Sequence, residues 1–264
     1  MQLQQIFIYP IKSTRAFSLQ QNFVRFQGLA FDRQFMLSEP DGTFITARKD
    51  YELFKFSAFP LPFGLFVKHQ DGSQIQINYQ DFSEQQNCEV WGSEFNSLVA
   101  PEQINRWFSE KLQRPVQFRY LGSNSQRRIK RFPDNPVSFA DGYPLLLCSE
   151  QTLAAVQQAC PAPIKMAQFR PSIVVDGIEP FVEQNWHKIR IGELEFINGK
   201  PSIRCTLIAR DPDTLIENPK LEPFRTLKKV HKNEEGKPLF GINLVPLNEG
   251  VIQVGDQVEV LEWK

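Results

Sequence analysis

The chain has 264 residues, which is enough for one large or two modest domains, and 41% of them are hydrophobic, which supports a substantial core. Its 30 Lys and Arg residues balance 30 Asp and Glu residues, so no overall field draws it to nucleic acid and any anion site must be local. The cysteines are widely spaced and form no C-x-x-C or C-x-x-H pair, which excludes most self-contained zinc and iron–sulfur modules.

The sequence also lacks the features of an exported or membrane-bound protein. Its first residues have no basic segment followed by a continuous apolar stretch, as a secretory signal would. The longest apolar runs are core-sized, well short of the roughly 18 to 20 residues that a membrane span needs. We therefore expect a cytoplasmic protein with no membrane partner, whose cysteines are reduced.

Most of the chain has the pattern of β-strands. Short runs rich in Phe, Ile and Val alternate with polar residues, and turn residues separate them about every 8 to 12 positions. The pairs Asp41-Gly42 and Asp71-Gly72 lie between such runs, including TFITA at residues 43–47, and predict hairpin turns. Strands without βαβ spacing favour barrels or sandwiches, so the predicted fold class is mainly β with a few helices (α+β).

Two segments have helical spacing instead. Residues 101–113 carry apolar side chains on one helical face, with Pro101 where a first turn tolerates it. Residues 149–160 follow the same pattern, and Ser149 is the predicted N-cap. Residues 222–231 (EPFRTLKKVH) add a third, shorter helical segment.

A basic stretch interrupts the pattern in the middle of the chain. Five basic residues and no acidic one lie between Arg119 and Arg131, in a polar segment that we interpret as a solvated loop or linker. We place the domain boundary there, which gives an N-terminal domain of residues 1–118 and a second domain of residues 119–264.

Common catalytic motifs are absent from the sequence. It contains no G-x-G-x-x-G after a strand, no G-x-x-x-x-G-K-[ST], no H-E-x-x-H and no G-x-S-x-G. The three histidines are scattered along the chain, so general acid–base chemistry built on histidine is not indicated.

Several motifs in a fixed order resemble one known family. FRPSIVVDG, KPSIRCTLIARDPDT, FGINLVPL and GVIQVGDQVEVL follow one another between residues 169 and 261, and this segment resembles the MOSC domain. The upstream segments YPIKS and GLAFDRQFML resemble the β-barrel domain that precedes MOSC in the mitochondrial amidoxime-reducing component and its bacterial two-domain relatives. The resemblance implies two β-rich domains, with a β-barrel MOSC domain packed with an N-terminal β-barrel-like domain and a molybdopterin-type cofactor held in the cleft between them.

The resemblance also implies the residues of the site. Cys205 of the K-P-x-x-R-C motif matches the cysteine that ligates molybdenum, and Asp141 of FADG matches an acidic residue near the metal. The positions that match cofactor contacts are Lys12, Ser13, Arg33, Arg170, Arg204 and Asn243.

The residue types fit this chemistry in part. A molybdopterin carries a phosphate and a polar ring system, so it requires cationic and hydroxyl donors. Molybdenum prefers a soft thiolate, which Arg204 beside Cys205 and the nearby Lys200 would favour. Taken alone, Cys205 is more often a buried strand cysteine, and this is the interpretation that Cys88, Cys148 and Cys160 keep. Lys12 and Arg33 alone are most often surface ion-pair residues.

The chain departs from the family pattern at three places. Ser202 replaces a frequent second cysteine, Ser172 replaces the asparagine of F-R-P-N, and Ile208-Ala209-Arg210 replaces a polar Thr-Thr-Val segment after the cysteine. The missing second cysteine argues against a two-thiol redox role, and the altered polarity near the metal bears on substrate identity and on activity itself.

The first functional hypothesis is an oxidoreductase that uses molybdenum with molybdopterin to reduce N-hydroxylated compounds (amidoximes, hydroxylamines and N-hydroxylated bases), with electrons from a separate flavin or iron–sulfur reductase. The alternative is a sulfur or molybdenum-cofactor carrier that uses Cys205. A β-rich interaction module without a cofactor is a third possibility. Family annotation also links MOSC to pyridoxal phosphate, but no lysine here has a recognisable Schiff-base context.

Overall fold

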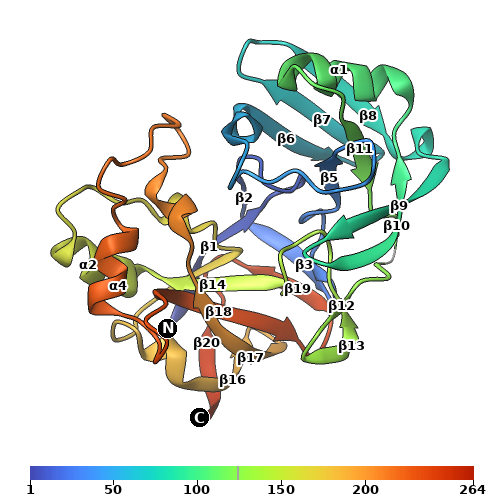
Figure 1. Ribbon diagram of the computed structural model, residues 1–264. Helices are drawn as coiled ribbons and strands as arrows, with labels where there is room; N and C mark the ends of the chain where they lie inside the picture. Colours follow the sequence, from blue (N-terminus) through green and yellow to red (C-terminus); the bar gives the residue numbers. More distant parts are fainter. Residues whose placement is uncertain (124) are drawn as a thin grey trace. The chain divides into compact units, whose positions relative to one another are not determined.

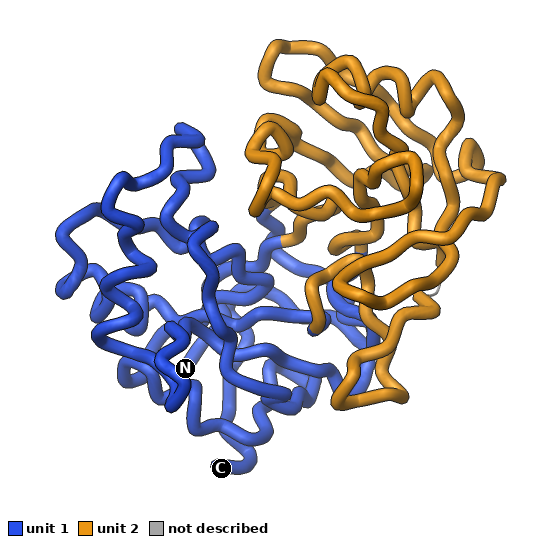
Figure 2. The backbone as a smooth tube through the Cα atoms, viewed as in Figure 1, with its two compact units in different colours: residues 1–7, 18–30, 143–264 blue, residues 8–17, 31–142 orange. Residues whose placement is uncertain are grey.

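The computed structural model describes residues 1–123 and 125–264, and this part of the chain is mainly β with four α-helices (Figure 1). The predicted fold class is confirmed. Contacts divide the chain into two compact units (Figure 2): unit 1 comprises residues 1–7, 18–30 and 143–264, and unit 2 comprises residues 8–17 and 31–142. Each of these units combines several segments of the chain, so this division does not test a single boundary in the sequence, and the boundary after residue 118 stays a prediction.

The largest element of unit 1 is a curled sheet of eight strands (Figure 1). In spatial order these are β2 (Phe17–Leu19), β1 (Gln2–Ile8), β15 (Ile173–Asp176), β14 (Leu145–Ser149), β18 (Leu239–Pro246), β17 (Leu194–Ile203), β16 (Trp186–Ile191) and β20 (Val258–Trp263). β14 and β15 are parallel, and the first three residues of β15 are all buried. A continuous apolar run of this kind is typical of a strand covered on both faces.

A smaller sheet and three helices complete unit 1. The sheet consists of β19 (Gly250–Gln253), β3 (Gln21–Arg25) and β4 (Gly28–Leu29). The helices are α2 (Glu150–Ala159), α3 (Met166–Phe169) and α4 (Phe224–Val230), with 3₁₀ turns η3 (Val182–Asn185) and η4 (Thr206–Ala209). Their apolar sides share one core cluster, which includes Val156 of α2, Ile208 of η4 and Leu227 of α4.

Unit 2 contains three small antiparallel sheets and one helix. The strands are β5 (Phe35–Ser38), β11 (Gln117–Tyr120), β10 (Ser93–Val99) and β9 (Glu84–Val90) in the first sheet, β6 (Phe56–Leu61), β7 (Gly64–His69) and β8 (Gln74–Asn78) in the second, and β12 (Arg128–Ile129) and β13 (Phe132–Pro136) in the third. The 3₁₀ turns η1 (Tyr51–Lys55) and η2 (Tyr79–Asp81) flank the second sheet. Helix α1 (Glu102–Leu112) packs on β11, where the rings of Phe108 and Phe118 stack with centroids 4.5 Å apart. Stacked aromatic rings contribute beyond their buried area.

Local sequence signals predict the longer elements correctly. α1, α2 and α4 all form where helical spacing places them, and Ser149 caps α2 by accepting a hydrogen bond from the Thr152 amide at 3.3 Å. The Asp71-Gly72 turn joins β7 to β8 as predicted. None of the helices in the described residues is long and apolar enough to cross a membrane.

Two predictions are wrong in part. Residues 43–47 form no strand, only single bridges from Thr43 to Glu89 and from Phe44 to Ser38, because the chain turns again at once at residues 46–50. The basic segment is not simply a solvated loop, since β12 and β13 pair within it and Arg119 and Arg127 are buried. Asn124, which belongs to the same segment, lies outside the described residues.

Candidate functional site

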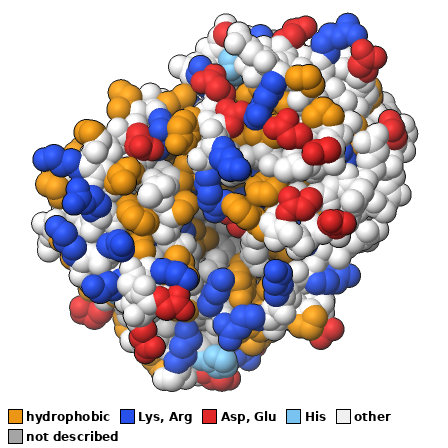
Figure 3. All heavy atoms as spheres, in the orientation of Figure 1, with side chains coloured by type: hydrophobic (Ala, Val, Ile, Leu, Met, Phe, Trp, Pro, Cys, Tyr) orange, Lys and Arg blue, Asp and Glu red, His pale blue; other side chains and the backbone are white. Residues whose placement is uncertain are grey.

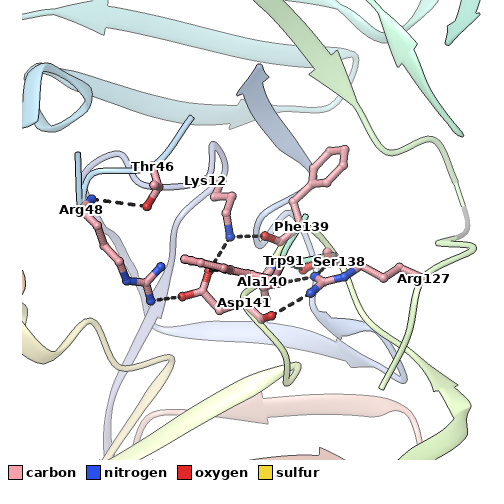
Figure 4. A network of polar contacts seen from close by, with 9 residues as sticks. All are labelled: Lys12, Thr46, Arg48, Trp91, Arg127, Ser138, Phe139, Ala140 and Asp141. Carbon is pink, nitrogen blue, oxygen red and sulfur yellow. Dashed lines mark hydrogen bonds and ion pairs between the residues drawn. The ribbon is translucent and has the colours of Figure 1, made fainter. Parts of the chain in front are cut away.

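Lys12 of unit 2 is buried rather than exposed. Lys12 is only 4% exposed, and its Nζ donates to the Phe139 carbonyl at 2.7 Å and to Asp141 Oδ1 at 2.5 Å (Figure 4). Burial lowers the pKa of Lys12 from its ordinary 10.5 to about 8, although the Asp141 carboxylate opposes this change. The interpretation of Lys12 as a surface ion-pair residue is therefore wrong. A buried cation is costly unless it is paired, and here the Asp141 carboxylate pairs with it.

Asp141 is the carboxylate at the centre of this group. It receives Arg48 at 2.6 Å on Oδ2 and Trp91 Nε1 at 3.0 Å on Oδ1, in addition to Lys12 (Figure 4). Desolvation raises the pKa of the Asp141 carboxyl, but the charges of Lys12 and Arg48 outweigh it and hold the pKa well below its usual range. Asp141 is therefore an anion at neutral pH. These contacts favour a role as counter-ion of Lys12 and Arg48 over proton transfer.

Arg127 completes the group, although nothing in the sequence distinguishes it from the other basic residues between Arg119 and Arg131. It is 6% exposed and its guanidinium donates to the carbonyls of Ser138 (3.1 Å), Ala140 and Asp141 (2.7 Å) (Figure 4). We call Lys12, Arg48, Trp91, Arg127 and Asp141 the Lys12 cluster. Three cations in it bond to residues 138–141, where Asp141 alone is negative. An excess of positive charge of this kind suits an anionic ligand.

Ser13 and Arg33 lie next to the Lys12 cluster. Ser13 has φ +71° in the tight turn that follows Lys12, and Arg33 has φ +48°, so both occupy the left-handed region. The Arg33 guanidinium binds Asp32 and lies 4.2 Å from the Tyr9 ring centroid. Its carbonyl accepts the Phe139 amide at 2.9 Å, which ties it to the residue that holds Lys12. The predicted residues of unit 2 are thus brought together.

Cys205 lies in unit 1 between β17 and η4. All four cysteines are within the described residues, none forms a disulfide, and only Cys205 is partly exposed. Burial raises the pKa of the Cys88 and Cys148 thiols, which makes these two poor thiolates. The interpretation of Cys88, Cys148 and Cys160 as core residues is confirmed. Cys205 is the cysteine that a ligand could reach.

Arg204 and Arg170 meet at the carbonyl group of Phe169. Arg204 donates to the Phe169 carbonyl at 2.7 Å and to the Ser202 hydroxyl at 2.9 Å. Arg170 follows Phe169 directly and caps α3 with φ +55°, a left-handed conformation that sequence reasoning did not anticipate. Arg204, which directly precedes Cys205, is therefore bonded to the peptide group that joins Phe169 to Arg170.

Asn243 joins the same part of unit 1 through strand pairing. It is the register partner of Lys200 across β17 and β18, and its amide approaches the Lys200 carbonyl at 3.4 Å. Lys200 itself lies over the Tyr143 ring at 5.3 Å. Lys200 thus lies on β17, shortly before Cys205 in the chain, and Asn243 lies beside it on the neighbouring strand β18.

The departures from the family pattern have structural roles. The buried Ser172 accepts from the Leu146 amide at 3.3 Å and so fixes β15 to β14, and Ser202 holds Arg204. Ile208 and Ala209 are 1% and 2% exposed and face the core. In this chain Ile208 and Ala209 therefore serve packing rather than polar contact with a ligand.

Among the residues that the structure describes, no group of three or more His, Cys, Asp or Glu side chains could hold a metal ion. A metal at Cys205 therefore requires further ligands from a cofactor. Molybdopterin fits this donor set, because it brings its own sulfur ligands and the chain would need to provide only one thiolate. Its phosphate is anionic and would bind to several cationic side chains.

Family models match both halves of the chain. The MOSC N-terminal beta barrel domain matches residues 1–115, and the MOSC domain matches residues 134–259. The chain belongs to the MOSC-domain family, in the form that carries the N-terminal MOSC barrel.

Named relatives lie in the same family. The mitochondrial amidoxime reducing component 2 of Rattus norvegicus is 30% identical over 97% of this chain and 82% of its own length. The mitochondrial amidoxime-reducing component 1 of Xenopus laevis is 28% identical over 97% and 81%. The molybdenum cofactor sulfurase of Oryza sativa is 29% identical over 97% of this chain but only 35% of its own length. Two of these relatives are thus named for amidoxime reduction and one for the molybdenum cofactor.

Proposed function

We propose that the chain is a molybdenum-cofactor oxidoreductase that reduces N-hydroxylated compounds, such as amidoximes and hydroxylamines, with electrons from a separate flavin or iron–sulfur reductase. The observation that carries the proposal is Cys205, the one partly exposed cysteine, within a motif and a family whose relatives are named for amidoxime reduction. Each turnover is R₂N–OH + 2 e⁻ + 2 H⁺ → R₂NH + H₂O, so the N–O bond breaks and the reductase is oxidised.

The residues of the chain divide the work between them. When bound, molybdenum with molybdopterin supplies the two-electron chemistry. Cys205 would hold the metal through its thiolate, and Arg170, Arg204 and Asn243 would orient the cofactor by hydrogen bonds. Lys12, Ser13 and Arg33 stay predicted cofactor contacts, and the excess of positive charge in the Lys12 cluster supports this for an anionic group. Asp141 would keep Lys12 and Arg48 in position.

The first test is metal and pterin analysis of protein made in a host that synthesises molybdopterin. We expect stoichiometric molybdenum in the wild type and its loss in Cys205→Ala. Cys160→Ala is the matched control: because Cys160 is buried and is not the proposed ligand, this variant should retain its molybdenum. Equal molybdenum content in the wild type and Cys205→Ala would overturn the assignment of the ligand.

A cofactor or sulfur carrier is the second candidate. Its support is the buried Ile208 and Ala209, which remove polar side chains from the segment after Cys205. Reduction of benzamidoxime with an artificial reductant separates the two candidates. Turnover by the molybdenum-loaded wild type supports the oxidoreductase, and a loaded protein without turnover supports the carrier.

A further inference from the structure

Helix α4 of unit 1 carries a group of exposed cations that the proposed site does not use. Arg225, Lys228 and Lys229 project from one side of the helix at i, i+3 and i+4, and Lys232 follows just after the helix ends. Lys and Arg side chains gather over the part of unit 1 where α2 and α4 lie (Figure 3). We call these four residues the α4 patch.

The charges of the α4 patch are not neutralised by the chain. Within residues 1–123 and 125–264 none of the four has an ion-pair partner, whereas many other surface cations, such as Lys55, Arg106 and Lys188, do. Lys228 and Lys229 in the last turn also interact favourably with the negative end of the helix dipole. This interaction is modest and does not explain why the cations lack counter-ions. An exposed, unneutralised basic surface attracts an acidic partner.

The α4 patch lies on the element that packs behind the Cys205 segment. Leu227 of α4 and Ile208 of η4 belong to one buried cluster, and η4 begins directly after Cys205, its N-cap residue. A partner bound to the exposed side of α4 would therefore contact the helix whose buried side packs against the turn that follows Cys205.

We propose that the α4 patch is the docking surface for the electron-donor protein, and that this donor is a small redox protein with an acidic face. The inference rests on the proposed function, which consumes two electrons per N–O bond broken and needs an external reduced flavin or iron–sulfur centre to supply them. Electron-transfer complexes are small and transient, so one helix with its flanks is large enough. Val230 is the last residue of the helix and 44% exposed, so it offers an apolar contact at the edge of the α4 patch.

The test compares full-length, cofactor-loaded variants of equal charge change. Lys228→Glu/Lys229→Glu reverses the α4 patch, and Lys68→Glu/Lys130→Glu is the control, because both control lysines are exposed and have no ion-pair partner among the described residues. The probe is an acidic plant-type [2Fe–2S] ferredoxin, and basic cytochrome c serves as the negative partner. Ferredoxin affinity should weaken at least tenfold in the α4 variant and with added salt, and stay unchanged in the control variant.

Turnover provides the second readout. Ferredoxin-driven reduction of benzamidoxime should fall at least tenfold in kcat/KM in the α4 variant, while reduction driven by methyl viologen is unchanged. If the wild type shows no turnover with viologen, the proposed function fails, and the binding experiment still decides the docking surface. Equal ferredoxin affinity in both double variants would overturn the docking proposal. A DNA duplex that binds the patch as tightly as ferredoxin would overturn it as well.

Discussion

At the scale of single residues, the buried Lys12 cation is the most informative feature. A lysine ordinarily has a pKa of 10.5, and here burial lowers it to about 8. Below pH 8 both folded and unfolded chains bind the proton, so the full cost of burying the charge is present. Between pH 8 and 10.5 only the unfolded chain binds it, so the free energy of unfolding rises with pH in that window.

We therefore expect the stability of the cofactor-free wild type to rise relative to that of Lys12→Met by about 2 kcal/mol between pH 7 and pH 10. Urea unfolding of both proteins at several pH values measures the difference. Lys68→Met, at an exposed position, should give a curve parallel to that of the wild type. Parallel curves for Lys12→Met would show that Lys12 does not bear the cost of a buried charge.

Individual residues also show how far the candidate site could be predicted. The choice of Cys205 among four cysteines follows from motif order, and its partial exposure agrees with it. Arg127 could not be found, because its three carbonyl acceptors lie on residues 138–141 and only tertiary structure brings them to it. Motif order names Lys12 and Asp141, but only the structure shows that they are in contact.

At the scale of elements, the buried carboxylate of η3 is fixed to the start of α2. Glu183 is fully buried, and the Thr152 hydroxyl lies 3.0 and 3.1 Å from its two oxygens. The same hydroxyl accepts the Phe181 amide at 2.8 Å, so it links η3 and α2. Burial raises the pKa of Glu183 from its ordinary 4.5 to about 7.

This raised pKa predicts a loss of stability as pH increases. Between pH 4.5 and 7 the folded chain holds the proton of Glu183 more tightly than the unfolded chain, so the protonated group stabilises the fold fully below pH 4.5, and this contribution is lost as pH rises through 7. We expect Glu183→Gln to gain about 3 kcal/mol relative to the wild type between pH 4 and pH 8. Thermal or urea unfolding across this range measures the gain. The exposed Glu179→Gln should show none, and a constant gap for Glu183→Gln would contradict the prediction.

Elements with strong local signals were predictable, and those decided by tertiary contacts were not. Helix α2 has an N-cap and a periodic apolar face, and both are present in the structure. Helix α3 has four residues and is held by Gln168, which donates to the Ile208 carbonyl at 2.8 Å from forty positions away. No window of the sequence contains that contact, so neither α3 nor the left-handed Arg170 that ends it could be inferred.

At the scale of the whole molecule, the N-terminal segment belongs with the C-terminal half. Strand β1 (Gln2–Ile8) pairs with β15, and β3 (Gln21–Arg25) pairs with β19, so these two N-terminal strands complete both sheets of unit 1. Spacing along the chain predicts strands but not which strands pair when more than 160 residues separate them.

These pairings predict how fragments of the chain behave. Residues 119–264 alone lack the buried Leu3, Ile6, Val24 and Leu29, each of which contributes about 2 to 5 kcal/mol, and the sum is as large as the whole stability of a typical domain, about 5 to 15 kcal/mol. We expect this fragment to show no cooperative unfolding transition by circular dichroism. A permuted chain of residues 143–264, a flexible linker and residues 1–30 should recover one, because it restores β1 and β3.

The linker can be short. The Met1 carbonyl accepts the Val258 amide at 3.1 Å, so the N-terminus lies beside the start of β20. The C-terminus is then roughly 20 Å further along, at about 3.3 Å per residue, which about ten Gly and Ser residues can span. The matched control replaces residues 1–30 by a scrambled sequence of the same composition and should remain unfolded. Cooperative unfolding of residues 119–264 without the N-terminal strands would show that the C-terminal half folds independently of β1 and β3.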